Sequence, residues 1–310
     1  MKRFLIIGLG PIGGILAAHL ESIGQECYGV DVWDEHRKAI NSDGITINGQ
    51  EEQHSKITKT AKSIAELKDV AFDCAVISVK TPIMPKIVEE LKTHPGDFMV
   101  ASFQNGIGNE EYLVQHFDKS RVMRGSINYA GGVVSPGKMV MAFFHKPNYI
   151  GCLCSDGICD HAKEIADLMT KSGLDTEATE NIKLYTWKKA ILNAGLSALT
   201  AILGWTMSQA MTNKESLKVV EMVLKESIEV AKADGYTYGD DFLDICMKYL
   251  GGAGPHKPSM LIDVENGQHT EIDYINGRIA ALGEKLGVPV PVNTLLTTMV
   301  KARELDNLKV

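Results

Sequence analysis

The chain has little cysteine and no long apolar run, and both shortages exclude classes of protein. Six cysteines among 310 residues are too few for a scaffold built on disulfides. The longest stretch without a charged residue, 190–213, contains polar residues such as Asn193 and Gln209, which indicates a buried helix rather than a membrane span. The apolar run after Met1 is interrupted by four glycines between residues 8 and 14, so we do not expect a signal peptide. We therefore expect a cytoplasmic protein.

An excess of positive charge is also missing. The formal net charge is −7, and no cluster of lysine or arginine supplies the basic surface that nucleic acids and anionic membranes require. A small molecule is therefore the expected partner. Hydrophobic residues make up 45% and charged residues 23%, as in globular proteins, and 310 residues are enough for two domains. The sequence leaves a monomer and a homodimer open.

Three cysteines and a histidine lie close together in the sequence, at Cys152, Cys154, Cys159 and His161. Their spacing matches none of the common zinc patterns. Cys152 and Cys154 also alternate within an expected strand over residues 149–154. We expect ordinary thiols here and no metal site.

Strand-like and helix-like segments alternate through the first 125 residues. The expected strands are short apolar runs without strict alternation, which is typical of strands buried on both faces; they cover residues 4–7, 27–31, 74–79, 98–103 and 122–127. Helical patterns lie between them, at residues 12–23, 35–41, 83–92 and 110–117. This order predicts right-handed crossovers and a Rossmann-type, doubly wound parallel sheet.

The pattern changes further along the chain. Residues 131–154 are rich in valine, methionine and aromatic residues with glycine and proline turns, and predict a few more strands. After Thr179 nearly every pattern is helical. We therefore expect an α/β fold with a dinucleotide-binding Rossmann domain over residues 1–179 and a helical substrate-binding and catalytic domain over residues 180–310.

A glycine-rich segment follows the first expected strand directly and opens the first expected helix. It consists of Gly8, Leu9, Gly10, Pro11, Ile12 and Gly13. Glycines at this point allow a tight turn, a close approach of the backbone to a pyrophosphate and packing of the helix on the strand. The helix N-terminus then faces the negative phosphates. In this context the segment predicts a dinucleotide site.

Asp31 ends the second expected strand, 18 residues after Gly13, where a carboxylate can bind the ribose hydroxyls of adenosine. We expect NAD(H), because a carboxylate repels the additional phosphate of NADP(H). NADP(H) stays open, since His36, Arg37 and Lys38 follow closely and could reach such a phosphate.

A row of polar residues interrupts the apolar segment 187–201. On a helix, Lys189, Asn193 and Ser197 are successive i, i+4 neighbours and span an arc of about 80°. Such a row is costly in a buried helix unless it meets something polar, such as a substrate. The alternative is that Lys189 reaches solvent while Asn193 and Ser197 bond the backbone of their own helix. Spacing alone does not separate these two interpretations.

A second polar cluster precedes an apolar helical stripe that begins at Ile272. Thr270 and Asp273 resemble a capping box, which predicts a helix start at this point and places Glu271 in its first turn. There the carboxylate would either interact with the helix dipole alone or contact a substrate.

Several segments together resemble the ketopantoate reductase family, in the same order and over nearly the whole chain. They are residues 8–13, Val79-Lys80, 104–108, 187–193, 199–201, 259–261 and 270–277. The resemblance implies that Lys189 is the general acid, that Glu271 positions it and contacts the substrate, and that Asn105 meets both nicotinamide and substrate. It also implies that Lys80 and Ala130 lie beside the cofactor and that Asn193 and Ser259 bind substrate.

Three positions depart from the family pattern. Ser197, which we also expect to bind substrate, stands where many members carry an asparagine followed by proline. Met207 stands where another polar substrate contact is common, and Val32 where many members carry an arginine. The departures at Ser197 and Met207 concern the substrate side, so the reaction class is better supported than the substrate.

The resemblance implies reduction of ketopantoate to pantoate in pantothenate and coenzyme A biosynthesis. A second interpretation is an NAD-dependent D-2-hydroxyacid dehydrogenase that acts on other branched or aromatic 2-oxo acids. A third, disfavoured by the joint presence of Lys189, Asn105 and Glu271, is a nicotinamide-binding regulatory protein without turnover.

Overall fold

The computed structural model describes residues 1–153 and 157–307, which form two compact units. Unit 1 comprises Met1–Gln104 and Asn109–Ile182, and unit 2 comprises Asn105–Gly108 and the chain from Lys183 onward. The chain therefore passes into unit 2 three residues after the expected boundary at residue 179. The short segment Asn105–Gly108 belongs with the helical unit although its neighbours in sequence lie in unit 1.

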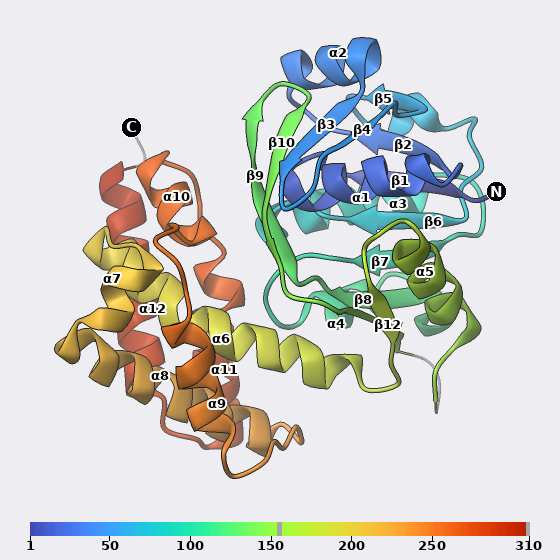
Figure 1. The fold of residues 1–310 in the computed structure, drawn as a ribbon. Coiled ribbons are helices and arrows are strands. Elements are labelled where there is room, and N and C mark those ends of the chain that lie inside the picture. Colours follow the sequence, from blue (N-terminus) through green and yellow to red (C-terminus); the bar gives the residue numbers. More distant parts are fainter. Residues whose placement is uncertain (154–156, 308–310) are drawn as a thin grey trace. The chain divides into compact units, whose positions relative to one another are not determined.

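Unit 1 is built on a main sheet in the order β12-β11-β8-β7-β6-β1-β2-β5 (Figure 1). Its strands are β1 (Arg3–Ile7), β2 (Glu26–Val30), β5 (Lys59–Ala61), β6 (Cys74–Ile77), β7 (Met99–Ser102), β8 (Val122–Ser126), β11 (Asn148–Cys152) and β12 (Thr176–Ala178). From β5 to β8 all pairs are parallel, and the chain order reverses between β1 and β6. This is the expected doubly wound topology, and the fold class is confirmed.

A second sheet has the order β4-β3-β10-β9. It consists of β3 (Ile45–Gly49), β4 (Gln53–Ser55), β9 (Tyr129–Ser135) and β10 (Lys138–Phe144). The sequence predicted strands in the region of β9 to β11, but β3, β4 and β5 were not expected. Strand β3 pairs with β10, about ninety residues later, so its pairing is not visible in local sequence.

Helices cover both faces of the main sheet. They are α1 (Pro11–Ser22), α2 (Asp34–Asp43), α3 (Met84–Thr93), α4 (Asn109–Leu113) and α5 (Asp160–Lys171), with single 3₁₀ turns η1 (Ile64–Leu67), η2 (Thr81–Ile83) and η3 (Lys119–Arg121). Phe4 and Ile6 of β1 lie in a core with α1 and α5, whereas Leu5 and Ile7 lie in a second core with α3. Burial of both strand faces explains why β1 lacks alternation.

Unit 2 is helical and has its own core around α6. Its elements are α6 (Ile182–Leu203), α7 (Met207–Thr212), α8 (Lys214–Ala233), α9 (Phe242–Gly251), α10 (Ser259–Glu265), η4 (Ile272–Tyr274), α11 (Asn276–Leu286) and α12 (Pro291–Asn307). The uncharged stretch 190–213 covers the larger part of α6 and the whole of α7. None of the described helices has the length and apolar character needed to cross a membrane.

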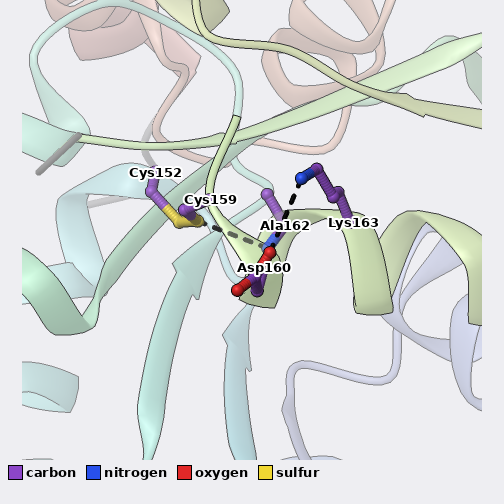
Figure 2. The surroundings of a disulfide bond; sticks show 5 residues. All are labelled: Cys152, Cys159, Asp160, Ala162 and Lys163. Atoms are coloured by element: carbon purple, nitrogen blue, oxygen red, sulfur yellow. Dashed lines mark hydrogen bonds and ion pairs between the residues drawn. A yellow bond between two sulfur atoms is a disulfide. The ribbon is translucent and has the colours of Figure 1, made fainter. Parts of the chain in front are cut away.

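The expectation of ordinary thiols at residues 152–159 was wrong for two of them. Cys152, at the end of β11, forms a disulfide with Cys159, which precedes α5 (Figure 2). The Sγ atom of Cys159 also accepts a hydrogen bond from the backbone N–H of Ala162 at 3.4 Å, as an N-cap residue does. Cys154 lies outside the described residues, and within those residues no group of three or more possible metal ligands occurs.

Candidate cofactor and active site

The glycine turn between β1 and α1 has the geometry that a dinucleotide requires. Gly8 has φ +92°, a conformation that other residues rarely adopt. A Cβ atom on Gly13 would lie 2.0 Å from the carbonyl oxygen of Gly8 and 2.3 Å from Ser78 Oγ, so only glycine lets α1 pack this closely on the strands. A Cβ atom on Gly10 would meet nothing within 4 Å, so space is open beside this residue.

The turn lies where dinucleotides bind in this topology. Gly8 follows β1, and Ser78 and Lys80 follow β6, the neighbouring strand at which the chain order reverses. The carboxyl ends of these two strands flank the cleft that holds ligands in doubly wound sheets. The first helical residue is Pro11, which lacks an N–H group, and no side chain caps the helix N-terminus. The geometry therefore fits a pyrophosphate at the start of α1.

Asp31 follows β2 at the same edge of the sheet and is half-buried. Its Oδ2 atom accepts a hydrogen bond from the N–H of Leu9 at 2.8 Å, and its Oδ1 atom accepts one from the N–H of Trp33 at 2.9 Å. The carboxylate thus supports the turn directly. Each oxygen has a second lone pair with which it can bind a ribose hydroxyl.

The expectation that His36, Arg37 or Lys38 could reach a phosphate is wrong for His36. Its ring is only 1% exposed and bonds the backbone of Leu9 and of Gly137. Arg37 forms an ion pair with Asp34 one helical turn earlier. Lys38 remains exposed on α2.

Tyr129 supports the first turn of α1 from the second sheet. Its hydroxyl donates a hydrogen bond to the carbonyl oxygen of Ile12 at 2.9 Å. The ring is buried, and burial raises the pKa of the hydroxyl well above its usual range, so it remains a donor. Ala130 follows it on β9 and is half-buried. The sequence did not single out Tyr129, because its contact depends on pairing between distant strands.

In unit 2, the polar row lies on one long helix as expected. Lys189 and Asn193 are half-buried on α6, and Ser197 is 8% exposed. Neither the Asn193 amide nor the Ser197 hydroxyl forms a hydrogen bond with any residue that the structure describes. Thr200 on the same helix does bond its backbone, through Leu196 O at 2.8 Å. Asn193 and Ser197 therefore do not make the backbone bonds of the alternative interpretation.

Glu271 is 5% exposed, and it precedes the single turn η4 rather than lying in an α-helix. The expected helix start with a capping box at Thr270 is wrong, because α11 begins only at Asn276. The Thr270 hydroxyl instead accepts a hydrogen bond from the N–H of Ile272 at 3.1 Å. The Ile275 backbone, with φ −112° and ψ −97°, interrupts the helical path and separates η4 from α11.

The segment that contains Asn105 packs against η4 within unit 2. The N–H of Ile107 donates to the carbonyl oxygen of Tyr274 at 3.0 Å. Gly106 has φ +91°, and a Cβ atom there would lie 2.5 Å from the same oxygen. Only glycine allows this approach, which brings the Asn105 segment to the end of the turn that Glu271 begins.

A buried asparagine that had no expected role of its own joins the two polar segments of unit 2. Asn276, fully buried at the start of α11, donates from Nδ2 to Ala194 O on α6 at 3.1 Å and to Asn293 Oδ1 at 3.1 Å. Ala194 follows Asn193 in the polar row. The segment around Glu271 is thereby tied to the helix that carries Lys189. Ser259, which is also expected to bind substrate, lies exposed at the start of α10.

Comparison with known proteins covers the same two parts of the chain. The family model described as ketopantoate reductase PanE/ApbA matches residues 4–154, and the model of its C-terminal region matches residues 181–304. A 2-dehydropantoate 2-reductase from Aquifex aeolicus is 30% identical, and the alignment covers 100% of this chain and 99% of the relative. The chain belongs to the ketopantoate reductase family.

Other similar proteins give the same picture. A 2-dehydropantoate 2-reductase from Pyrococcus horikoshii is 29% identical over 97% of both chains. Among solved structures, D-mandelate dehydrogenase with NADH and anilino(oxo)acetate is 27% identical and superposes with a TM-score of 0.88 over 99% of both chains. A 2-dehydropantoate 2-reductase from Geobacter metallireducens, at 24% identity, matches in fold with a TM-score of 0.89 and covers 97% of this chain and 99% of that chain.

Proposed function

We propose that this chain reduces ketopantoate to pantoate with a nicotinamide cofactor and that Lys189 is the general acid. Family membership and the reductase names of its relatives support the reaction. The observation that carries the proposal is the polar row on α6. In this row the side chains of Asn193 and Ser197, which follow Lys189 at intervals of four residues, form no hydrogen bond with the described residues. Unpaired polar groups in a largely apolar helix suit a polar substrate.

The residues divide the chemistry between them. The bound cofactor supplies a hydride, which reduces the 2-oxo carbon of the substrate. Negative charge then develops on the carbonyl oxygen, and the Lys189 ammonium stabilises that charge and donates the proton. Glu271 positions Lys189 and contacts the substrate, Asn105 orients substrate and nicotinamide, and Asn193, Ser197 and Ser259 bind the substrate.

For the cofactor we propose NAD(H) over NADP(H). It would lie on the glycine turn, with Lys80 and Ala130 beside it. Asp31 places a negative charge where the phosphate of NADP(H) would lie, and Val32, which is 76% exposed, offers no compensating cation. We place the reaction in the cytoplasm, with no nucleic acid or membrane as partner, and leave monomer and homodimer as alternatives.

A D-2-hydroxyacid dehydrogenase is the second candidate. The specific support is D-mandelate dehydrogenase, which was solved with NADH and is 27% identical to this chain. That enzyme's name implies an aromatic 2-hydroxy acid, whereas the reductases in the family act on a branched 2-oxo acid. The departures at Ser197 and Met207 lie on the side that would distinguish the two.

Steady-state oxidation of NADH and NADPH at 340 nm with a panel of 2-oxo acids tests the proposal. We expect the highest kcat/KM with ketopantoate and with NADH. A far higher kcat/KM with phenylglyoxylate would favour the dehydrogenase. Cofactor binding without turnover of any 2-oxo acid would favour a regulatory protein.

A further inference from the structure

Hydrogen bonds fix the two peptide groups on either side of Leu9, in the middle of the glycine turn. In the Gly8–Leu9 peptide, the carbonyl oxygen accepts from Ser78 Oγ at 2.9 Å, and the N–H donates to Asp31 Oδ2 at 2.8 Å. In the Leu9–Gly10 peptide, the carbonyl oxygen lies 3.0 Å from His36 Nε2. The Leu9 side chain is buried over Gly29, where a Cβ atom would lie 2.6 Å from it.

The contacts of His36 define its protonation. The N–H of Gly137 donates to Nδ1 at 3.2 Å, so Nδ1 carries the lone pair. Nε2 therefore carries the hydrogen and donates it to Leu9 O. The ring is 1% exposed and stacks on Trp33, with centroids 5.0 Å apart and an interplanar angle of 8°. It is held on both edges and on one face.

The planarity of the peptide bond transmits this contact to the next residue. In a trans peptide the C=O and the following N–H point in opposite directions. The bond from His36 to Leu9 O therefore turns the N–H of Gly10 away from His36. This N–H donates to none of the described residues, and the space beside Gly10 is open.

We infer that His36 is a positioning residue for the cofactor, because it orients the Leu9–Gly10 peptide so that the Gly10 N–H is presented to a bound pyrophosphate. Glycine at position 10 would otherwise let this peptide rotate and present a carbonyl oxygen, which repels phosphate. The inference rests on the nicotinamide cofactor of the proposed function and not on which 2-oxo acid is reduced.

Two substitutions separate this role from a purely structural one. His36→Gln keeps an N–H near the position of Nε2 and loses the acceptor for Gly137. His36→Asn keeps an acceptor near Nδ1 and loses the donor to Leu9 O. His94→Gln is the matched control, since His94 is a buried histidine of the same unit whose Nε2 contacts Leu67 O at 3.2 Å, on the face covered by α3.

The dissociation constant of NADH is measured by calorimetry for each variant, together with Tm and with kcat at saturating NADH. We expect His36→Asn to bind NADH about tenfold more weakly, and His36→Gln and His94→Gln to stay within about threefold of wild type. In each variant kcat stays within about twofold. Equal weakening by Asn and Gln, in proportion to their loss of Tm, would overturn the inference.

A measurement on the unchanged chain covers the case in which His36→Asn does not fold. With ¹⁵N-labelled histidine, the resonances that disappear in His36→Gln identify His36. We expect a neutral ring protonated at Nε2 whose signal shifts on addition of NADH. Protonation at Nδ1, or no shift at saturating NADH, would contradict the inference. NADH binding without turnover would refute the reductase proposal alone, whereas a wild-type chain that binds no NADH would refute both.

Discussion

The glycine turn of unit 1 and the polar row of unit 2 satisfy their polar groups in opposite ways. In the glycine turn, the backbone on either side of Leu9 is held at fixed positions by hydrogen bonds to Asp31, Ser78 and His36. On α6, the side chains of Asn193 and Ser197 form no hydrogen bond with the described residues. The glycine turn is therefore organised before any ligand binds, whereas the polar row keeps side-chain hydrogen-bonding groups available for a ligand.

This difference follows from what each region is expected to bind. A pyrophosphate is recognised by backbone N–H groups, whose directions must be set in advance because rotation of a peptide would present an oxygen instead. A 2-oxo acid is recognised by side chains, which can complete their hydrogen bonds when it arrives. Changes in the turn should therefore weaken cofactor binding, and they should also lower stability where they displace the packed backbone, whereas changes in the row should affect the substrate alone.

Among the changes that test this difference, substitution of Gly13 should have the largest effect. In Gly13→Ala the Cβ atom would overlap the Gly8 carbonyl oxygen, which costs about 1–3 kcal/mol of folding free energy and displaces the turn. We expect a lower Tm and NADH binding at least tenfold weaker. Gly10→Ala is the control, since its Cβ atom enters open space: Tm should hold while NADH binding weakens. Equal Tm losses in the two variants would contradict this account.

Reduction of the Cys152–Cys159 disulfide should change stability without changing the turn. Closing a loop of this size stabilises the fold by about 2 kcal/mol, so Cys152→Ser should lower the Tm of unit 1 by about 4–8 °C. Dithiothreitol should lower the Tm of wild type equally.

The free thiols of Cys27, Cys74 and Cys246 are buried, and burial raises the pKa of Cys246 to about 11, so alkylation at pH 8 should spare them in the folded chain.

Removal of the Ser197 hydroxyl should affect only the substrate. We expect Ser197→Ala to raise KM for the 2-oxo acid by about 3- to 10-fold, the equivalent of one hydrogen bond, with unchanged Tm and NADH affinity. Thr200→Val removes a hydroxyl that bonds the backbone of the same helix and should leave KM unchanged. A KM increase in Thr200→Val as large as that in Ser197→Ala would show that the helix, not the hydroxyl, was disturbed.

The smallest expected effect concerns cofactor choice. Val32→Arg adds a cation at an exposed position beside Asp31, and we expect KM for NADPH to fall by about two- to fivefold. The gain should shrink as salt is added, because exposed charges are screened. A wild-type enzyme that already prefers NADPH strongly would overturn the assignment of NAD(H).

The sequence predicted those parts of the fold that have local causes. Strand β1, the glycine turn and α1 were placed to within about one residue, because an apolar run, glycines and a helical pattern follow one another directly. The polar row on α6 was visible for the same reason, since its spacing repeats every four residues. The helix expected over residues 110–117 was too long, and α4 ends at Leu113.

Features that depend on distant partners were missed. The role of His36 is set by Leu9 and Gly137, and local patterns do not show that the turn at Gly137, about a hundred residues later, contacts His36. Asn276 acts through Ala194, eighty-two residues earlier. The sequence alone suggested a ligand contact for His36 because this residue lies close to Asp31. Nothing in the local sequence indicates that the histidine is buried.

The most direct test of the proposed mechanism is to replace Lys189, the proposed general acid. Lys189→Ala should lower kcat for ketopantoate by about 10²-fold or more while the dissociation constant of NADH stays within about twofold of wild type. Lys188→Ala, which removes the adjacent exposed lysine, should leave both values unchanged. A Lys189→Ala enzyme with nearly normal kcat would show that the proton donor lies elsewhere.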